Sequence, residues 1–245
     1  MKPIKIFLVI GLIVLSITKG LHAQQSMKPG TSLDGKQQSI ITISALTAKG
    51  DLEQLQKALH KGLDAGLTIN QMKEVLVQIY AYAGFPRSIR GLQTLMSIIQ
   101  ERKANGINDK MGADASPVND DREKYVRGRE ILGNLTGASQ LGPATGYSAF
   151  APVMDTFLKE HLFADIFERD VLSYAERELV TISVLSSIGG VEPMLQSHLN
   201  ISLNVGLTPD QLQHFVAVIE SSAGKEEAKA AQAVLDGVLQ NRKSQ

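Results

Sequence analysis

The chain shows the hydrophobic periodicity of α-helices along most of its length. Apolar residues recur every three or four positions, and no segment has the convincing alternation that marks a half-buried strand. Capping residues and glycines divide this pattern into helices at about 35–48, 51–64, 69–82, 86–103, 120–132, 149–168, 174–188, 193–204, 209–222 and 225–241. The sequence therefore predicts an all-α protein.

Two groups of these helices repeat each other at an interval of about 140 residues. The segment Ile41–Leu46 recurs as Val180–Leu185, and Ala65–Thr68 recurs as Val205–Thr208. The helix starts repeat too, because a capping side chain stands three residues before Gln or Glu at Asp34, Thr68, Ser173 and Thr208. We place copy one at 33–103 and a more complete copy two at 122–240, joined by a polar linker at 104–121.

Each copy is short and amphipathic, so neither is expected to bury its apolar faces alone. We therefore expect the two copies to pack on each other as a pseudo-symmetric pair. The alternative is two independent domains on a flexible tether.

The first residues have the pattern of a secretory signal peptide at 1–23. Lys2 and Lys5 precede an apolar run from Ile6 to Ile17, which is too short to span a bilayer of about 30 Å comfortably. An uncleaved anchor is the alternative. We expect an exported protein, periplasmic or secreted, that starts near Gln24 and has no membrane attachment after cleavage.

Composition removes several classes of function. The chain has no Cys, which excludes disulfides, thiolate nucleophiles and Cys-ligated metals. Loss of the signal peptide removes three Lys and no acidic residue, which leaves 22 basic and 25 acidic residues. A net charge of that sign does not favour a nucleic-acid partner. Hydrophobic residues make up 43% of the chain, with no Trp, so the core must be mainly aliphatic.

His198 and Glu178 are the strongest candidates for chemistry. His198 shares a helix stripe with Met194 and Ile201, so its side chain is expected to point inward. Glu178 lies in the first turn of a helix that is apolar on nearly all sides, so its carboxylate is expected to be buried and to need a partner. A His–carboxylate pair in an apolar cleft can act as a general acid and base. A structural ion pair is the alternative.

The two copies have diverged in complementary ways. Copy one has Ala58 in place of His198, and its counterpart of Glu178 is a neutral residue in the Gln38-Ser39 dipeptide. Only copy one has the sequence Tyr-Ala-Tyr-Ala-Gly-Phe-Pro, which supplies Tyr80 and Tyr82. We infer one composite site, built from the pair of copy two and this corner of copy one. Ordinary drift after duplication is the alternative.

Other motifs are weaker. His161 and Asp165 have the i,i+4 spacing of two metal ligands, within a charged cluster that extends to Asp170. A solvated helix face explains the same pattern, and we expect no metal site. The sequence contains no Gly-rich phosphate loop and no nucleophile elbow.

At these residues the chain resembles the carboxymuconolactone decarboxylase family, whose members have the alkylhydroperoxidase D-like helical fold. The resemblance rests on four stretches: Glu176–Ile182, Gly189–His198, Asn204–Pro209 and Tyr82–Pro86. It implies an all-α bundle of this type, duplicated within the chain. It also places Glu178 and His198 at the proton-relay positions of the family, with a spacing one residue longer. Peroxidase members also need a Cys pair upstream of the His, which is missing here.

The resemblance implies a cofactor-free lyase or isomerase that acts on a small carboxylated lactone or related acid. His198 would move the proton, Glu178 would set its tautomer, and Tyr80 or Tyr82 would complete the wall. Arg87, Arg169 or Arg177 would bind a substrate carboxylate through a bidentate fork. A non-catalytic exported binding or scaffold protein of the same fold is the alternative, and a thiol hydroperoxidase is disfavoured.

We also expect a homo-oligomer. The resemblance implies hexameric rings for members with a single unit, so a chain with two fused units would need three copies to form such a ring. The helices carry more apolar surface than one chain can cover. A trimer is therefore expected, and a monomer in light scattering at micromolar concentration would contradict it.

Overall fold

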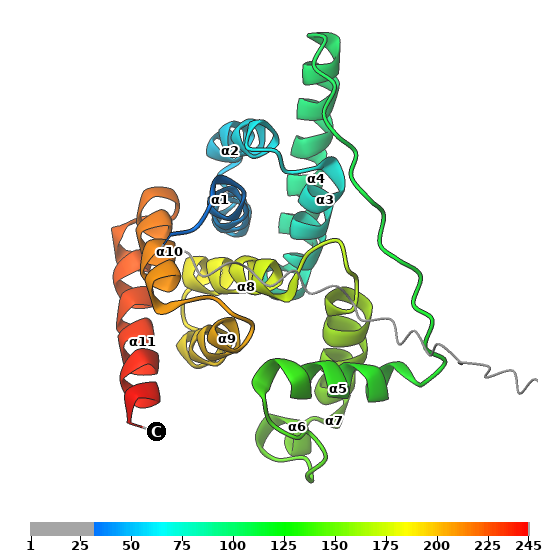
Figure 1. Cartoon of the computed structure of the whole chain (residues 1–245), viewed down its shortest axis with the longest axis vertical. Coiled ribbons are helices and arrows are strands. Elements are labelled where there is room, and N and C mark those ends of the chain that lie inside the picture. The colour runs from blue at the N-terminus through cyan, green and yellow to red at the C-terminus, as the bar shows by residue number, and fades with distance from the viewer. Residues whose placement is uncertain (1–31, 245) are drawn as a thin grey trace, which may run out of the picture.

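A computed structural model describes residues 32–244, and these residues form helices and no strand (Figure 1). The signal peptide expected at 1–23 lies outside this range. Copy one comprises α1 (Gly35–Lys49), α2 (Leu52–Asp64), α3 (Ile69–Gln78) and α4 (Tyr80–Ala104). Copy two ends in α8 (Tyr174–Ile188), α9 (Glu192–Asn204), α10 (Pro209–Ser222) and α11 (Lys225–Lys243). Copy two begins with α5 (Lys124–Thr136), α6 (Gly146–Phe150), α7 (Pro152–Thr156) and a π-helix, η1 (Phe157–Phe167).

The all-α prediction is confirmed. Among the described residues, none of these helices combines the length and the apolar character that crossing a bilayer requires.

Local sequence fixes where the repeated helices begin. The capping boxes predicted for α1, α3, α8 and α10 are all present. In α1, the Asp34 carboxylate accepts from the Gln37 amide at 2.9 Å, and the Gln37 side chain accepts from the Asp34 amide at 2.9 Å. Each box satisfies amides that the first turn of a helix leaves unpaired.

The break after the third helix of copy one falls close to its predicted place. The expected helices 69–82 and 86–103 become α3 and α4, and α4 contains a kink at Gly84, where φ is +80° and ψ is 161°. An L-residue with a side chain rarely adopts this conformation, and Pro86 follows two residues later. The kink turns the Tyr-rich start of α4 against the second copy, which is where the site lies.

The linker expected at 104–121 has no regular secondary structure after α4 ends, but it is bound to α3 and α4. The amides of Ile69 and Asn70 donate to the carbonyls of Lys110 and Met111, both at 2.9 Å. The carboxylate of Asp109 is also bound by Arg102 of α4, at 2.8 Å. Figure 1 shows this segment running beside α3 and α4 towards α5.

The middle of the chain differs most from expectation. The helix expected at 120–132 is α5, four residues further on, because Asp120 binds the Arg122 side chain at 2.6 Å instead of capping a helix. The single helix expected at 149–168 is divided into α6, α7 and η1. Ala151 is not helical, with φ of −131° and ψ of 77°, and Pro152 disfavours the α conformation for the residue before it.

The two copies pack into one body around α1 and α8. These helices contact each other directly, and Figure 1 shows α1 end-on and α8 lengthwise, so the two cross. One hydrophobic core spans both copies and includes fully buried residues of each, such as Ile41 and Ile43 of α1 and Val180 and Ile182 of α8. The packed pseudo-symmetric pair is therefore what the structure shows, and the tethered arrangement is wrong.

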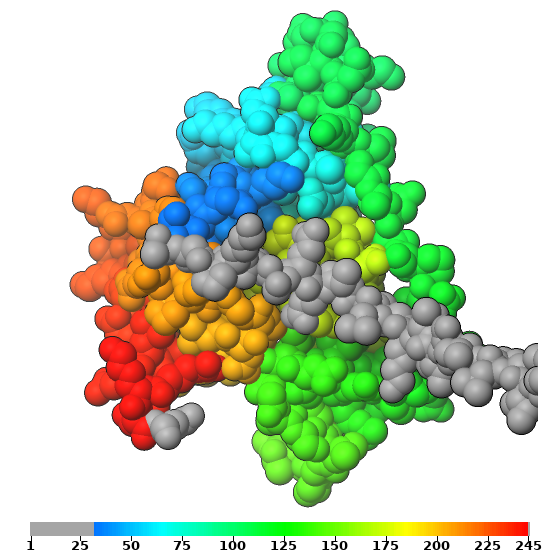
Figure 2. Space-filling view, in the orientation of Figure 1, coloured from blue at the N-terminus to red at the C-terminus, as the bar shows by residue number. Residues whose placement is uncertain are grey.

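The helices α5 to η1 add a lobe beside this pair, which Figure 2 shows in green below it. A second apolar cluster joins the lobe to α9 through residues such as Leu135, Phe163 and Ile201. Several large apolar side chains stay exposed on the lobe, and Phe150 is 93% exposed. These side chains fit the expected oligomer, which stays a prediction.

The close contact between α5 and η1 depends on one glycine. A Cβ added at Gly128 would stand 1.7 Å from the carbonyl oxygen of Lys159 and 3.2 Å from the amide nitrogen of Ala164. Both are backbone atoms, so a side chain at Gly128 would push the two helices apart. Gly133 lies on the same helix, where an added Cβ has no atom nearer than 3.4 Å.

We predict that Gly128→Ala lowers the free energy of unfolding by about 1–3 kcal/mol, the usual cost of overpacking. Gly133→Ala is the matched control and should stabilise by up to about 1 kcal/mol, because Ala favours a helix over Gly. Urea denaturation monitored by circular dichroism measures both. Equal effects of the two substitutions would contradict the close packing of α5 on η1.

Candidate active site

Helix α8 carries the buried carboxylate at the centre of the site. Glu178 has no exposed surface, and its neighbours along the helix, Leu179 and Val180, are also fully buried. The acidic residue of the first turn is Glu176, which completes the capping box with Ser173. Glu178 therefore lies just beyond the first turn in which we had placed it, where the helix dipole offers less stabilisation. Its charge needs a side-chain partner.

His198 of α9 is that partner. Its ring atom Nδ1 lies 2.9 Å from Oε2 of Glu178, and the His198 side chain is 13% exposed. The second ring nitrogen, Nε2, has no hydrogen-bond partner among the described residues, and neither does Oε1 of Glu178. The geometry leaves one ring nitrogen of His198 and one buried carboxylate oxygen of Glu178 without a partner among the described residues.

Tyr82 brings copy one into contact with this pair. Its ring meets the His198 ring edge-on, with centroids 6.1 Å apart and an interplanar angle of 84°. Its hydroxyl is hydrogen-bonded to the Thr181 hydroxyl of α8 at 3.1 Å. Burial raises the pKa of Tyr82 far above its usual value, and the negative charge of Glu178 raises it further. Its phenol therefore keeps its proton at neutral pH.

Tyr80 lies against the lobe. Its ring stacks on Phe85 at a centroid distance of 4.6 Å and approaches the ring of His161 at 5.5 Å. Its hydroxyl is buried and has no hydrogen-bond partner among the described residues. Both tyrosines thus face copy two, but only Tyr82 contacts His198 directly.

A polar network ties α3 to α8 next to the site. Arg177 is fully buried, and its guanidinium donates to Oε1 of Gln78 at 3.0 Å, to Oε2 of Glu74 at 3.2 Å and to the Arg169 carbonyl at 2.6 Å. Gln78 in turn donates to the Arg177 carbonyl at 2.8 Å and to the Thr181 hydroxyl at 3.0 Å. Arg177 therefore joins the two copies, and its guanidinium is committed inside the protein.

The other two arginines occupy different places. Arg169 binds Glu74 through Nε and Nη2, at 3.0 and 2.6 Å, and its side chain is 43% exposed. Arg87 is exposed and lies over Gly50, in the turn between α1 and α2. Of the three arginines, only Arg169 is both partly exposed to solvent and bound to Glu74, which also binds Arg177 of α8.

The sequence reading missed Glu74 and Gln78. Both are buried on α3, and Asn70 is buried one turn before them. A spacing of four residues puts all three on one face of a helix. This polar stripe on an inward face was the signal that could have revealed the network.

The other histidines in residues 32–244 contact groups away from this pair. His161 pairs with Asp165 at 2.9 Å, and Lys124 binds the same carboxylate at 2.8 Å. His214 accepts from the Leu33 amide at 3.1 Å, and His60 lies 3.9 Å from Glu101. Within residues 32–244, no three His, Asp or Glu side chains lie close enough together to hold a metal ion.

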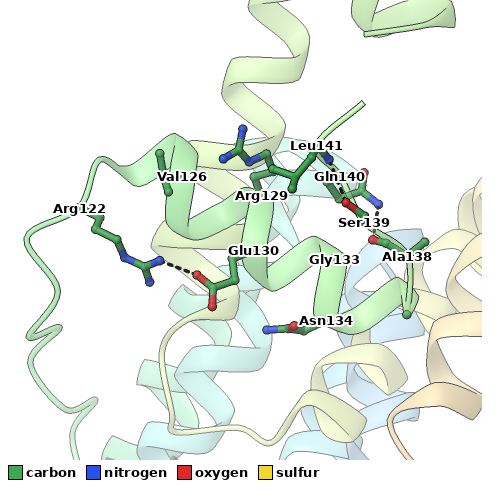
Figure 3. Close-up of a pocket in the computed structure, with 11 residues that line it drawn as sticks. Arg122, Val126, Arg129, Glu130, Gly133, Asn134, Ala138, Ser139, Gln140 and Leu141 are labelled. Carbon is green, nitrogen blue, oxygen red and sulfur yellow. Dashed lines mark hydrogen bonds and ion pairs between the residues drawn. The ribbon is translucent and has the colours of Figure 1, made fainter. Parts of the chain in front are cut away.

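A hollow of about 590 Å³ lies along α5 and the loop that follows it (Figure 3). Arg129 and Glu130 line it from the face of α5 opposite the buried residues Ile131 and Leu135, and Arg122 lines it from just before the helix. Figure 3 shows Arg122 pointing to Glu130, and the two are 2.6 Å apart. None of the predicted site residues lines this hollow, so we do not assign it to the site.

Two comparisons with known proteins bear on this arrangement. The sequence profile of the carboxymuconolactone decarboxylase family matches the chain over two regions, residues 21–95 and 152–237, which fits the two copies. A 4-carboxymuconolactone decarboxylase of Acinetobacter baylyi is 25% identical over 122 residues, 49% of this chain and 90% of the relative. An uncharacterized protein of Methanocaldococcus jannaschii is 25% identical over 77 residues, 31% of this chain and 72% of the relative.

The network beside the site predicts how stability depends on acidity. Burial acts to raise the pKa of Glu74, but the hydrogen bond from Arg169 and the charge of Arg177 outweigh it, so the pKa is lowered. A carboxyl whose pKa is lowered on folding stabilises the protein above its unfolded pKa of about 4.3, and this contribution is lost as pH falls through the folded value.

We predict that Glu74→Gln destabilises the protein by about 3–5 kcal/mol at neutral pH, because it leaves the buried Arg177 without its charge partner. The loss of stability on acidification should also be smaller in this variant than in the wild type. Glu53→Gln is the control, since Glu53 pairs with Lys57 on an exposed surface and should change stability by at most about 0.5 kcal/mol. Denaturant titrations from pH 7 to about pH 3 measure both effects, and parallel pH curves for wild type and Glu74→Gln would contradict the assignment.

Proposed function

Because the chain belongs to the carboxymuconolactone decarboxylase family, we propose that it is a cofactor-free lyase or isomerase acting on a small carboxylated lactone or related acid. The observation that carries this proposal is the 2.9 Å contact between Nδ1 of His198 and the buried Oε2 of Glu178. The substrate class follows from the family and from the name of the Acinetobacter baylyi relative.

The pair suits proton transfer to carbon. When a carboxylate leaves a lactone skeleton as CO₂, the carbon–carbon bond breaks and its electron pair stays on the skeleton. A proton must then be delivered to that carbon. In the protonated ring, Nε2–H of His198 would donate it, while Glu178 accepts the Nδ1–H bond and stabilises the imidazolium charge. The ring that remains is neutral and keeps its proton on Nδ1.

Other residues of the site would bind and position the substrate. Tyr82 keeps its phenol proton and forms a wall against the His198 ring. Arg169 has Nη1 without a hydrogen-bond partner among the described residues, and we propose it as the cation for a substrate carboxylate. The buried Oε1 of Glu178 and the Tyr80 hydroxyl also lack partners, which supports a polar ligand in this region. Arg177 would hold α8 in place rather than touch the substrate.

A non-catalytic exported binding or scaffold protein of the same fold is the second candidate. It is favoured by the burial of the pair, because Glu178 has no exposed surface and His198 has little. A buried His–carboxylate pair can serve stability alone. Removal of the His198 side chain should reduce turnover if the protein is an enzyme, and should reduce only stability if it is a scaffold.

We predict that His198→Ala and Glu178→Gln each reduce turnover by about 10²–10⁴-fold, the usual contribution of a general acid or base. The assay follows CO₂ release from 4-carboxymuconolactone and related lactone acids. The two losses should not add, since the residues act as a unit. Tyr82→Phe should impair turnover as well, because both copies form the site.

His60→Ala is the matched control and should keep full activity, since His60 lies on α2 at the surface near Glu101. Circular dichroism checks that each variant folds, and Glu178→Gln preserves side-chain volume where His198→Ala does not. Full turnover by folded His198→Ala protein would contradict an enzyme that works through this pair. A lowered melting temperature with no activity to lose would favour the scaffold.

A further inference from the structure

We propose that the chain has a second small-molecule site, between α1, α2 and α10, which binds a small hydroxylated carboxylic acid without converting it. A hollow of about 720 Å³ lies there. Figure 1 shows α2 and α10 on either side of α1. This proposal does not depend on the function proposed for the first site.

The hollow occupies the place in copy one that the catalytic pair occupies in copy two. Ser39 and Ala58 line it, and in the repeat these two stand at the positions of Glu178 and His198. Ser222 of α10 also lines it and stands at the position of Tyr82. The pseudo-symmetric packing therefore built two sites, each from both copies.

Smaller side chains opened this second site. Each of the three large groups of the first site is replaced by Ser or Ala, which leaves room for a ligand of several carbon atoms. The lining contains no His, Tyr, Asp or Glu. A general acid–base pair is therefore missing, and a bound acid would stay chemically unchanged.

The charges of the lining select an anion. Lys57 and Lys61 lie one turn apart on α2 and both line the hollow. Lys57 also pairs with the exposed Glu53 at 2.8 Å, whereas Lys61 forms no ion pair with any residue the structure describes. Two ammonium groups and no carboxylate in the lining favour a ligand carboxylate.

The hydroxyl groups of the lining select for ligand hydroxyls. Ser39 donates to the Gly35 carbonyl at 2.8 Å, Thr42 to the Gln38 carbonyl at 2.9 Å and Ser222 to the Val218 carbonyl at 2.7 Å. Each hydroxyl has one hydrogen and two acceptor lone pairs, so its oxygen remains free to accept. A ligand with both a carboxylate and hydroxyl groups fits the lysines and these oxygens together.

Isothermal titration calorimetry with malate, a small hydroxylated dicarboxylate, tests the proposal on the exported chain. We expect a dissociation constant at or below about 1 mM, and weaker binding of succinate, which lacks the hydroxyl. Lys61→Gln should weaken malate binding at least about fivefold, through loss of a charge-assisted contact. Ala58→Leu should abolish it by filling the hollow. Lys103→Gln, on α4 outside the hollow, is the control and should bind like the wild type.

His198→Ala tells the two sites apart. Malate binding that survives this change and is weakened by Lys61→Gln places the ligand in the second site. Binding that disappears in His198→Ala but persists in Lys61→Gln places it in the first site and overturns the proposal. Absence of binding by the wild type up to about 10 mM malate also overturns it. If Ala58→Leu fails to fold, the exposed Lys61→Gln change still decides the outcome.

Discussion

A carboxylate without exposed surface lies just beyond the first turn of α8, and the cost of removing it from water constrains the residues around it. Glu178 is surrounded by the aliphatic residues that make α8 the centre of the core. An ionised carboxylate in such surroundings is stable only when a charge or hydrogen-bond donor meets it. The 2.9 Å contact with His198 supplies that partner and fixes the position of α9 relative to α8. The residue that satisfies the carboxylate also has a second ring nitrogen without a hydrogen-bond partner among the described residues.

The His198–Glu178 pair occurs only in copy two, and copy one contributes the residues that support it. Crossing of α1 over α8 buries both helices, and the start of α4 then reaches copy two, where Tyr82 meets His198. Gln78 and Glu74 connect α3 to Arg177 of α8, so copy one holds the helix that bears Glu178. Copy one has the small residues Ser39 and Ala58 at the positions of Glu178 and His198, and these two residues line a hollow.

The sequence predicted most of the fold because its signals were local. Capping boxes such as Ser173 with Glu176, and the apolar stripes between them, set the ends of the repeated helices. The pairing of His198 with Glu178 followed from a solvation argument, since a carboxylate on an apolar helix needs a partner. The helix limits predicted for the middle region were wrong, because two local effects set them. Pro152 restricts Ala151, and Arg122 pairs with Asp120, and neither effect changes the apolar pattern. The predicted binding role of Arg177 overlooked Glu74 and Gln78, whose contacts with it cross about a hundred residues of chain.

We propose that Glu178 holds a proton on Nδ1 of His198 and leaves Nε2 to react. Nitrogen-15 NMR of the histidine-labelled protein measures this directly, because the two ring nitrogens differ in chemical shift and in coupling to their protons. We predict that the neutral ring carries its proton on Nδ1, in a hydrogen bond that is lost in Glu178→Ala. A neutral ring protonated on Nε2, with Nδ1 bare and unaffected by Glu178→Ala, would contradict this proposal.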